Sequence, residues 1–298
     1  MTTPSAHRFP LPWIRFPIIC IAALGLVCPI CCAQDLSGQP VRETLASQAN
    51  TKYMPFAHAH NDYLHRRPLR DALESGFASV EADVFLVDGD LCVAHTAAEI
   101  DRAKTLRNLY LEPLRQIVEG NGGRVRAGVS QPLVLLVDIK SDGRKTFAEL
   151  HRQLLAYRSM LFARGPDGEN PKGAVQVIVS GNRPFEDIES ANPRLATIDG
   201  RLSDLGHLRS CDLYPVLSDN WNLHFRWRGV GEIGQEDLEK LRTLVKSVHA
   251  EGKKLRFWAI PDREEVWRLL QREQVDFINT DRLKDLQMVL GANDSPRE

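Results

Sequence analysis

Two features that define other classes of protein are missing from this 298-residue chain. It has no run of Lys or Arg, and its formal net charge is -1, so no part of it predicts nucleic-acid binding. No Gly-rich phosphate loop follows the first apolar strand pattern, which disfavours a nucleotide-binding, doubly wound sheet. Hydrophobic residues make up 43% of the chain and charged residues 26%, as in an ordinary globular domain.

Cysteine is also scarce over most of the chain. Four of the six cysteines fall within the first 33 residues, and only Cys92 and Cys211 lie beyond them. Two cysteines so far apart in sequence do not form a disulfide framework. A single bridge between them and a pair of free thiols both remain open.

The N-terminal segment has the pattern of an export signal. Residues 1–33 contain Arg8 and Arg15 but no acid, and the apolar stretch FPIICIAALGLVCPICCAQ follows. This pattern predicts a signal peptide that ends at Ala33, and therefore a periplasmic or secreted protein. An uncleaved membrane anchor is the alternative, although the apolar run is short of the roughly 20 residues that span a bilayer. Residues 34–52 are polar without a clear period and predict a linker, and residues 293–298 predict a tail.

Residues 53–292 alternate between short apolar runs rich in β-formers and amphipathic stretches. The segment EDLEKLRTLVKSVHAEG, for example, repeats Leu and Val at a spacing of three to four, which predicts a helix. Alternating strands and helices imply parallel pairing with right-handed crossovers. We therefore predict a single α/β domain, a closed (β/α)8 TIM barrel, with an open doubly wound sheet as the alternative. The predicted strands lie near 54–60, 77–86, 132–139, 174–180, 195–199, 213–218, 254–260 and 275–279.

Acidic residues stand near the ends of two predicted strands, where a barrel carries its reactive groups. Glu81 and Asp83 are two positions apart and so point to the same side of their strand, and Asp138 and Lys140 do the same on the next strand. A charge facing a barrel interior must be paired or must bind an ion, because bare burial is too costly. The three carboxylates predict a site for one hard divalent cation, Mg²⁺ or Ca²⁺. Salt bridges from Glu81 and Asp83 to barrel arginines are the alternative.

Histidines are expected beside these carboxylates. The first predicted strand ends in His58-Ala59-His60, and Asp88-Gly89 forms a tight-turn signal after the second. That turn would send residues 91–94 back as an extension and bring His95 to the mouth of the barrel. Since imidazole accepts and donates protons near neutral pH, His60 and His95 are candidates for an acid–base pair. His58 is more simply explained as a packed structural residue.

The order of these features resembles a known superfamily. A histidine closes the first strand, E-x-D the second and D-x-K the third, with a DG turn and a second histidine between the last two. This order resembles the phospholipase C-like phosphodiesterases, which include glycerophosphodiester phosphodiesterases and sphingomyelinase D-type enzymes. The chain is most similar to the branch named for altered inheritance of mitochondria protein 6. The motifs that carry this resemblance are HAHNDY, PLRDALESGFASVEADVFLVDGDLCVAHT, YLEPL, VDIKSDG, SGNRP, SDNW and VDFINTDRL.

The resemblance implies a TIM barrel that hydrolyses phosphodiesters with one divalent ion. It implies general acid and base roles for His60 and His95, without assigning which is which. The remaining roles that it implies are metal ligation by Glu81, Asp83 and Asp138, a phosphate contact by Lys140, and a pocket wall formed by Trp258. Asn61, Arg183 and Asn220 are further substrate-binding candidates from their places beyond predicted strands, whereas Asp281 is expected to cap the last helix.

Three departures from the glycerophosphodiesterase pattern leave the substrate open. Asn61-Asp62 follow the first histidine, Asp138 stands where that pattern has glutamate, and Thr96 follows the second histidine. We predict a phosphoric diester hydrolase acting on a small-molecule or lipid phosphodiester, such as a glycerophosphodiester, in transient contact with a membrane surface. One alternative is a zinc amidohydrolase-like barrel that uses His58 and His60. The other is a non-catalytic secreted barrel that binds a ligand. The oligomeric state is not predicted.

Overall fold

The computed structural model describes residues 39–162, 173–207 and 209–291. The chain divides into a unit over residues 1–35 and a unit over 36–298, and every described residue belongs to the second. The predicted signal peptide and tail therefore lie outside the described residues. Among the described residues, no helix has both the length and the apolar character needed to cross a membrane.

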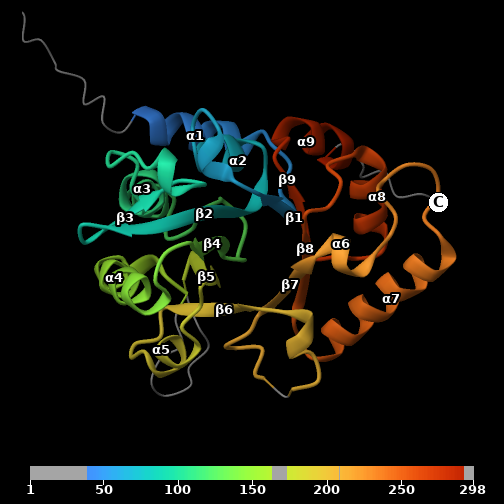
Figure 1. Cartoon of the computed structure of the whole chain (residues 1–298). Coiled ribbons are helices and arrows are strands. Elements are labelled where there is room, and N and C mark those ends of the chain that lie inside the picture. The colour runs from blue at the N-terminus through green and yellow to red at the C-terminus, as the bar shows by residue number, and fades with distance from the viewer. Residues whose placement is uncertain (1–38, 163–172, 208, 292–298) are drawn as a thin grey trace, which may run out of the picture. The chain divides into compact units, whose positions relative to one another are not determined.

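Eight parallel strands form a closed barrel, which confirms the predicted fold class. The strands follow the order β1-β9-β8-β7-β6-β5-β4-β2, and β1 also pairs with β2, so the sheet closes on itself. Figure 1 shows this ring of strands with helices around it. Each barrel strand corresponds to one of the predicted strands. Their bounds are β1 (Met54–Ala59), β2 (Phe77–Val87), β4 (Leu133–Ile139), β5 (Val175–Gly181), β6 (Ala196–Gly200), β7 (Val216–Asn220), β8 (Lys254–Trp258) and β9 (Phe277–Thr280).

A ninth strand, β3 (Asp90–Val93), extends the barrel as predicted from the DG turn. It runs antiparallel to β2, with Val87 opposite Asp90 and Val84 opposite Val93. Asp88 and Gly89 both have positive φ, 48° and 82°, as a tight hairpin turn requires. The hairpin returns the chain toward the barrel and places His95 two residues beyond the end of β3.

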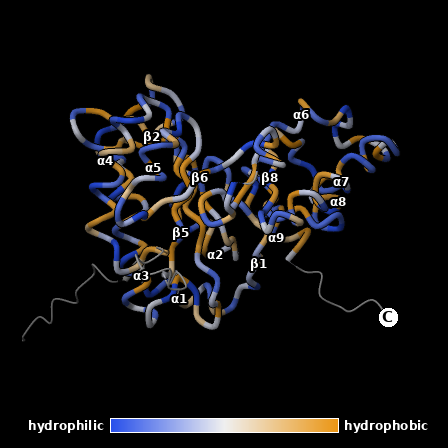
Figure 2. The backbone as a smooth tube through the Cα atoms, turned by 90° about the horizontal axis from the view of Figure 1, so that it is seen from below, coloured by the Kyte–Doolittle hydropathy of each residue, from blue (hydrophilic) through white to orange (hydrophobic). Residues whose placement is uncertain are grey.

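Helices cover the outside of the barrel, and several of them carry an apolar stripe that packs against it. In α7 (Gln235–Ala250), the buried residues Leu241, Val245 and Val248 recur at the spacing of one helical face. Figure 2 shows hydrophobic residues concentrated in the strands, with hydrophilic residues more frequent in the helices and loops. The other helices are α1 (Gln39–Ala49), α2 (Arg70–Glu74), α3 (Glu112–Gly120), α4 (Gly143–Ala156), α5 (Phe185–Ser190), α6 (Trp221–His224), α8 (Glu264–Arg272) and α9 (Leu283–Gly291).

The sequence predicted a linker over residues 34–52, but residues 39–49 of this segment form the helix α1. This helix contacts α2 and α3, and the Thr44 hydroxyl donates to Glu74 Oε1 at 3.3 Å. The Arg126 guanidinium donates to the backbone carbonyls of Gln48 and Thr51 at the end of the helix, where carbonyls have no partner within the helix. The polar composition of the segment concealed this helix, since its stability depends on residues far away in sequence.

The barrel interior has an apolar floor beneath a polar layer. Side chains two positions apart on one strand point to the same side, so Leu136 lies below Asp138 and Ile178 lies below Ser180. Five buried residues form the floor: Val134, Leu136, Ile178, Val216 and Phe277. The polar residues above it line the cavity described next.

Candidate active site

A cavity of about 290 Å³ opens at the carboxyl ends of the barrel strands. This is the end at which TIM-barrel enzymes carry their reactive groups. Eight of the site residues predicted from the sequence line the cavity together, and Ser180, Arg201 and Arg256 join them. The eight are His60, Asn61, Glu81, Asp83, His95, Asp138, Lys140 and Trp258.

The three acidic residues converge as the strand ends predict. Asp83 on β2 lies directly opposite Asp138 on the neighbouring strand β4, and Glu81 lies one inward-facing position earlier on β2. One carboxylate oxygen from each of the three lies within 4.8 Å of the other two. Glu81 and Asp83 are almost completely buried, with 4% and 1% of their surface exposed.

The surroundings of these carboxylates fit a divalent cation. Asp83 Oδ1 and Asp138 Oδ1 are both buried without a hydrogen-bond partner, a costly state that an ion would relieve. Gly181 makes room for Asp138, because a Cβ at that position would stand 2.1 Å from Asp138 Oδ1. Oxygen ligands alone favour a hard ion such as Mg²⁺ or Ca²⁺. Among the described residues, this is the one group of three such side chains close enough to share an ion.

Two basic side chains already partner the acidic cluster. Lys140 Nζ lies 3.2 Å from Asp83 Oδ2 and 3.1 Å from Asp138 Oδ2, and Arg256 donates to Glu81 Oε2 at 3.0 Å. Burial raises the pKa of Asp83 to about 6, and the charge of Glu81 adds to this effect. Burial would also raise the pKa of Glu81, but the charge of Arg256 keeps it below its ordinary value. The salt bridge to a barrel arginine, considered as the alternative to metal binding, thus exists for Glu81.

His60 is held with one ring nitrogen toward the cavity. Its Nδ1 lies 2.8 Å from Asp281 Oδ1, while its Nε2 lies 3.9 Å from Glu81 Oε2. The Asn61 amide nitrogen lies 2.9 Å from the same Nδ1 and 3.4 Å from Asp281 Oδ1. With the ring proton on Nδ1 donated to Asp281, the Asn61 amide donates to Asp281 as well, and Nε2 is free to accept a proton. Burial lowers the pKa of His60, but the hydrogen bond to Asp281 and the charge of Glu81 raise it above its ordinary value. Asp281, which the sequence predicts as a helix cap, therefore has a contact with His60 that its sequence position did not indicate.

His95 reaches the same cavity from the end of the β2–β3 hairpin. Its Nδ1 lies 3.1 Å from the Tyr63 hydroxyl and 3.5 Å from Asp83 Oδ2. The Tyr63 hydroxyl lies 2.8 Å from both Asp83 Oδ2 and Asn61 Oδ1, and it can donate to only one of them at a time. Tyr63 therefore joins a carboxylate of the acidic cluster to the second histidine, a role that its sequence position did not suggest.

His58 lies inside the barrel rather than in the cavity wall. Its Nδ1 lies 2.7 Å from Ser79 Oγ and its Nε2 lies 3.2 Å from Glu81 Oε2. Burial and the nearby charge of Arg256 lower the pKa of His58 to about 4, so the ring is neutral at physiological pH. The hydrogen bonds orient Glu81, and neither His58 nor His60 belongs to a three-residue metal-ligand group among the described residues. This arrangement gives no support to the zinc amidohydrolase alternative.

Two predicted substrate-binding residues do not line the cavity. Arg183 donates to the backbone carbonyls of Asp199 and Gly181 and lies over the ring of Phe185. The Asn220 side chain accepts from the backbone N–H of Asn222 and so begins α6. Their predicted contact with substrate remains a prediction, and Arg201 stands in the cavity wall near the place expected for Arg183.

The cavity residues Arg201 and Arg256 were not predicted from the sequence, and only Arg256 carries a sequence signal that could have revealed it. Arg256 is the middle residue of the strand KLRFW and is buried, so a charge within an apolar strand could have marked it. Arg201 follows β6 in a segment with no recognisable motif, so its sequence gives no such signal. Cys92 and Cys211, whose pairing was left open, are both free thiols.

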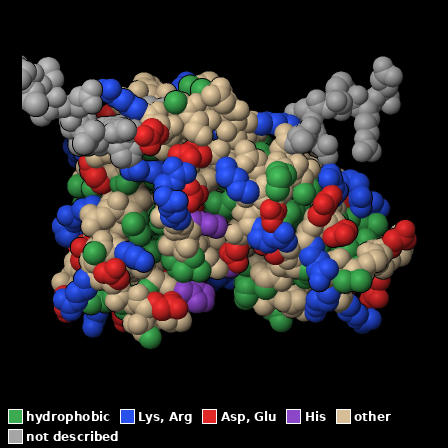
Figure 3. Space-filling model, turned by 90° about the horizontal axis from the view of Figure 1, so that it is seen from above, with side chains coloured by type: hydrophobic (Ala, Val, Ile, Leu, Met, Phe, Trp, Pro, Cys, Tyr) green, Lys and Arg blue, Asp and Glu red, His purple; other side chains and the backbone are tan. Residues whose placement is uncertain are grey.

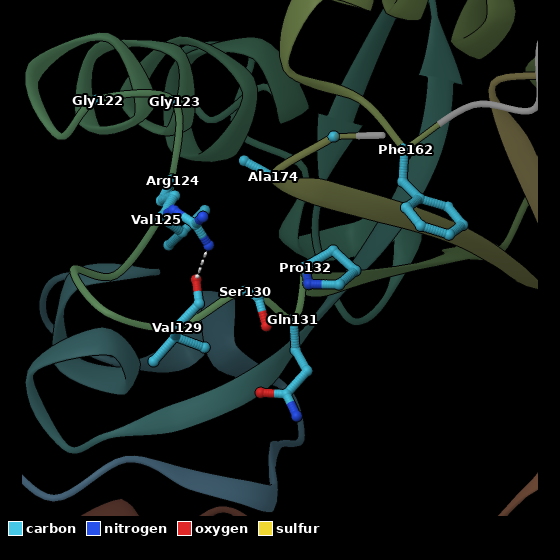
Figure 4. A pocket seen from close by; sticks show the side chains of 11 residues that line it. Gly122, Gly123, Arg124, Val125, Val129, Ser130, Gln131, Pro132, Phe162 and Ala174 are labelled. Carbon is cyan, nitrogen blue, oxygen red and sulfur yellow. Dashed lines mark hydrogen bonds between the residues drawn. The ribbon is translucent and has the colours of Figure 1, made fainter. Parts of the chain in front are cut away.

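A second cavity, of about 360 Å³, lies next to the starts of β4 and β5 (Figure 4). Its wall includes Pro132 and Ala174, each directly before a strand, so it belongs to the opposite end of the barrel. The one charged side chain among its described lining residues is Arg124, which donates to the carbonyl of Val129 at 3.0 Å. The larger cavity therefore lacks the acid–base groups that the smaller one brings together.

The fold and the smaller cavity define a TIM-barrel protein with an acidic cluster and two histidines at the mouth. Residues 48–196 match the model of a family described as the AIM6-like phosphodiesterase domain. This match covers half of the chain, and the chain belongs to that family. The resemblance inferred from the sequence motifs is confirmed.

Curated relatives agree with this assignment. A protein named altered inheritance of mitochondria protein 6 homolog, from Arthroderma benhamiae, is 29% identical over 256 residues, which cover 75% of this chain and 80% of the relative. Altered inheritance of mitochondria protein 6 from Eremothecium gossypii is 31% identical over 264 residues, which cover 76% of this chain and 67% of the relative.

Among solved structures, an endo-beta-1,4-glucanase from Bacillus licheniformis is 10% identical with a TM-score of 0.41, and the match covers 84% of this chain and 58% of that one.

Proposed function

We propose that the protein is a metal-dependent phosphoric diester hydrolase with His60 and His95 as its acid–base pair. One observation carries this proposal: three converging carboxylates and two imidazoles line one cavity in a barrel of a phosphodiesterase family. A divalent ion held by Glu81, Asp83 and Asp138 would neutralise charge on a non-bridging phosphate oxygen. Lys140 would add a second positive charge beside the same oxygen.

His60 suits the role of general base. With its Nδ1 proton held by Asp281, its Nε2 can accept the proton of the attacking hydroxyl or water. The bond from that oxygen to phosphorus then forms as the bond to the departing oxygen breaks. His95, when protonated, gives its proton to the departing oxygen, so one water is consumed and an alcohol and a phosphomonoester are released. If a neighbouring hydroxyl of the substrate attacks first, the product is a cyclic phosphate.

A glycerophosphodiester or phospholipid-type substrate is proposed for this site, consistent with contact with a membrane surface. Leu64 after β1, Leu223 after β7 and Trp258 at the end of β8 are exposed, at 64%, 74% and 36%. All three belong to the end of the barrel that carries the cavity, where an apolar rim would meet a lipid. Acidic and basic side chains are interspersed over the face drawn in Figure 3. Export through residues 1–33 is a further proposal, based on their sequence pattern alone.

The test is a screen of phosphodiesters with added Mg²⁺ or Ca²⁺, with products identified by phosphorus NMR. We expect hydrolysis that a chelator abolishes and that His60→Ala and His95→Ala each reduce by at least about 100-fold. His249→Ala is a matched control, because His249 Nε2 also pairs with a carboxylate, at 2.7 Å from Asp276, but stands on the outer helix α7. Saturable binding of a diester without turnover in any metal would instead support the ligand-binding barrel.

A further inference from the structure

One cation in the cavity wall, Arg201, is not engaged by the acidic cluster. Among the cationic side chains that line the cavity, Lys140 bridges Asp83 and Asp138, and Arg256 is bonded to Glu81. Arg201 directly follows β6, two strands away from β4, which carries Asp138. Strands are spaced about 4.8 Å apart, so the two positions are separated by roughly 10 Å across the cavity.

A buried carboxylate fixes one corner of the Arg201 guanidinium. Asp199 is completely buried and accepts hydrogen bonds from Ser218 Oγ at 2.5 Å and Ser180 Oγ at 2.8 Å. Arg201 Nη1 completes this set at 2.9 Å and also donates to the carbonyl of Gly200 at 3.0 Å. Because both serines hold Asp199 from neighbouring strands, the guanidinium is positioned by a rigid network rather than by a flexible loop.

The opposite edge of the same guanidinium has no partner among the described residues. Every hydrogen bond of Arg201's side chain with them uses Nη1, which leaves Nε and Nη2 unengaged. Those two N–H groups form the parallel fork that binds a carboxylate or phosphate in bidentate fashion. The Arg201 side chain remains 26% exposed, so this edge can be reached by a ligand.

Neighbouring charges leave the Arg201 side of the cavity positive. Arg183 lies close by and shares the Asp199 carbonyl with Arg201. Within the described part of the chain, the Asp199 carboxylate is the one acid bonded to either side chain. Asp204 accepts from the Arg201 backbone N–H at 2.8 Å and also lies 3.5 Å from Arg209. These two acids face three arginines, so the group keeps one net positive charge.

The cations of the cavity divide between its two sides. Lys140 and Arg256 are paired with the acidic cluster, where a divalent ion would add positive charge for the phosphate of the diester. Arg201 is the lining cation on the other side, where the group of three arginines and two acids keeps one net positive charge. That side can therefore receive a second anionic group of the substrate.

We propose that Arg201 is a specificity-determining residue that binds a second anionic group, a carboxylate or a phosphate, on one alcohol of the diester. This inference rests on the proposed diesterase function and names its substrate class. The fork of Arg201 would hold that group while the ester phosphate lies at the acidic cluster. The preferred substrates are therefore diesters with two separate negative charges.

Two matched substrate pairs test the proposal. Glycerophosphoserine differs from glycerophosphoethanolamine by a carboxylate, and glycerophosphoinositol 4-phosphate differs from glycerophosphoinositol by a phosphate. We expect kcat/KM to be at least tenfold higher for the more anionic member of one or both pairs, and the pair affected identifies the anion. Arg201→Gln should remove this preference, so that the two members of the pair have kcat/KM values within about threefold of each other.

Two further variants separate recognition from folding and from general charge. Arg201→Lys keeps a charge for Asp199 but lacks the fork, so it should fold normally and lose most of the preference. Arg183→Gln removes a neighbouring charge that does not line the cavity, and it should retain the preference. Equal kcat/KM values for the two members of each pair in the wild type would overturn the proposal. A preference that survives in both Arg201→Gln and Arg201→Lys would also overturn it.

The absence of diester hydrolysis would refute the proposed function but not the role of Arg201. Ligand binding tests the role of Arg201 in that case. Titration calorimetry with Mg²⁺ present would then compare phosphoserine with phosphoethanolamine. We expect the wild type to bind phosphoserine at least tenfold more tightly than phosphoethanolamine. Arg201→Gln should bind the two ligands with equal affinity. The absence of any difference in the wild type would contradict the role of Arg201.

Discussion

Gly181 shows how closely the acidic cluster depends on the barrel backbone. An added Cβ at this position would stand 2.1 Å from Asp138 Oδ1 and 2.5 Å from the Ile139 carbonyl oxygen, whereas ordinary contacts begin near 3.4 Å. In Gly181→Ala the Asp138 carboxylate must therefore move by about 1.3 Å to restore an ordinary contact. The φ of +69° also strains alanine, by about 1–2 kcal/mol. A shift of this size should weaken metal binding about 10- to 100-fold.

The assay is calorimetric titration of chelator-treated protein with Mg²⁺ or Ca²⁺, beside hydrolysis of bis(p-nitrophenyl) phosphate. Diester hydrolysis at a fixed metal concentration should fall by roughly 100-fold, because a 1 Å misplacement has effects of that order. Gly206→Ala is the control, since Gly206 has a φ of +83° but no atom within 4 Å of the point that an added Cβ would occupy. It should carry the same backbone strain and leave metal affinity unchanged. Wild-type metal affinity in Gly181→Ala would refute the placement of Asp138 as a ligand.

Three further predictions concern groups around the cluster. Asp281→Asn should move the acid limb of kcat/KM to lower pH, because it removes the carboxylate that raises the pKa of His60, and it should lower the plateau at least tenfold. Tyr63→Phe should cost about 10-fold in activity by releasing His95, as supporting residues of metal sites typically do, while a wild-type rate would exclude this role. Burial raises the pKa of Asp62 to about 7, so its contribution to stability is present below pH 3.8 and is lost as the pH rises to about 7. In thermal melts, Asp62→Asn should therefore be as stable as the wild type at pH 4. At pH 8 its free energy of unfolding should be higher than that of the wild type by up to about 4 kcal/mol. The same difference in stability at both pH values would contradict burial of the Asp62 charge as the cause.

The fold was predictable because strand and helix periods are local properties. Every barrel strand corresponds to an apolar run, and the Asp88-Gly89 turn alone indicated the β2–β3 hairpin. The end of β8 was placed too late, at residue 260, because Ala259 adopts a φ of +55° that its residue type does not suggest. The helix α1 was missed for a different reason, since Arg126 binds its last carbonyls from a distant loop.

The predicted residues that line the cavity all sit on strands or within two positions of a strand end. Strand alternation placed Glu81, Asp83 and Asp138 correctly because parallel neighbours bring equivalent positions together. The partners Tyr63 and Asp281 come from loops, and no sequence period reports which way a loop side chain turns. Their contacts with the two histidines therefore became visible only in the folded structure.

The proposed chemistry depends most directly on whether the three carboxylates share one cation. Chelator-treated protein titrated with Mn²⁺ and followed by electron paramagnetic resonance measures this without any substrate. We predict one bound Mn²⁺ per chain in the wild type, and a loss of affinity of at least about tenfold in both Asp83→Asn and Asp138→Asn. Tight binding that persists unchanged in both variants, or no binding in the wild type, would contradict a shared cation at this site.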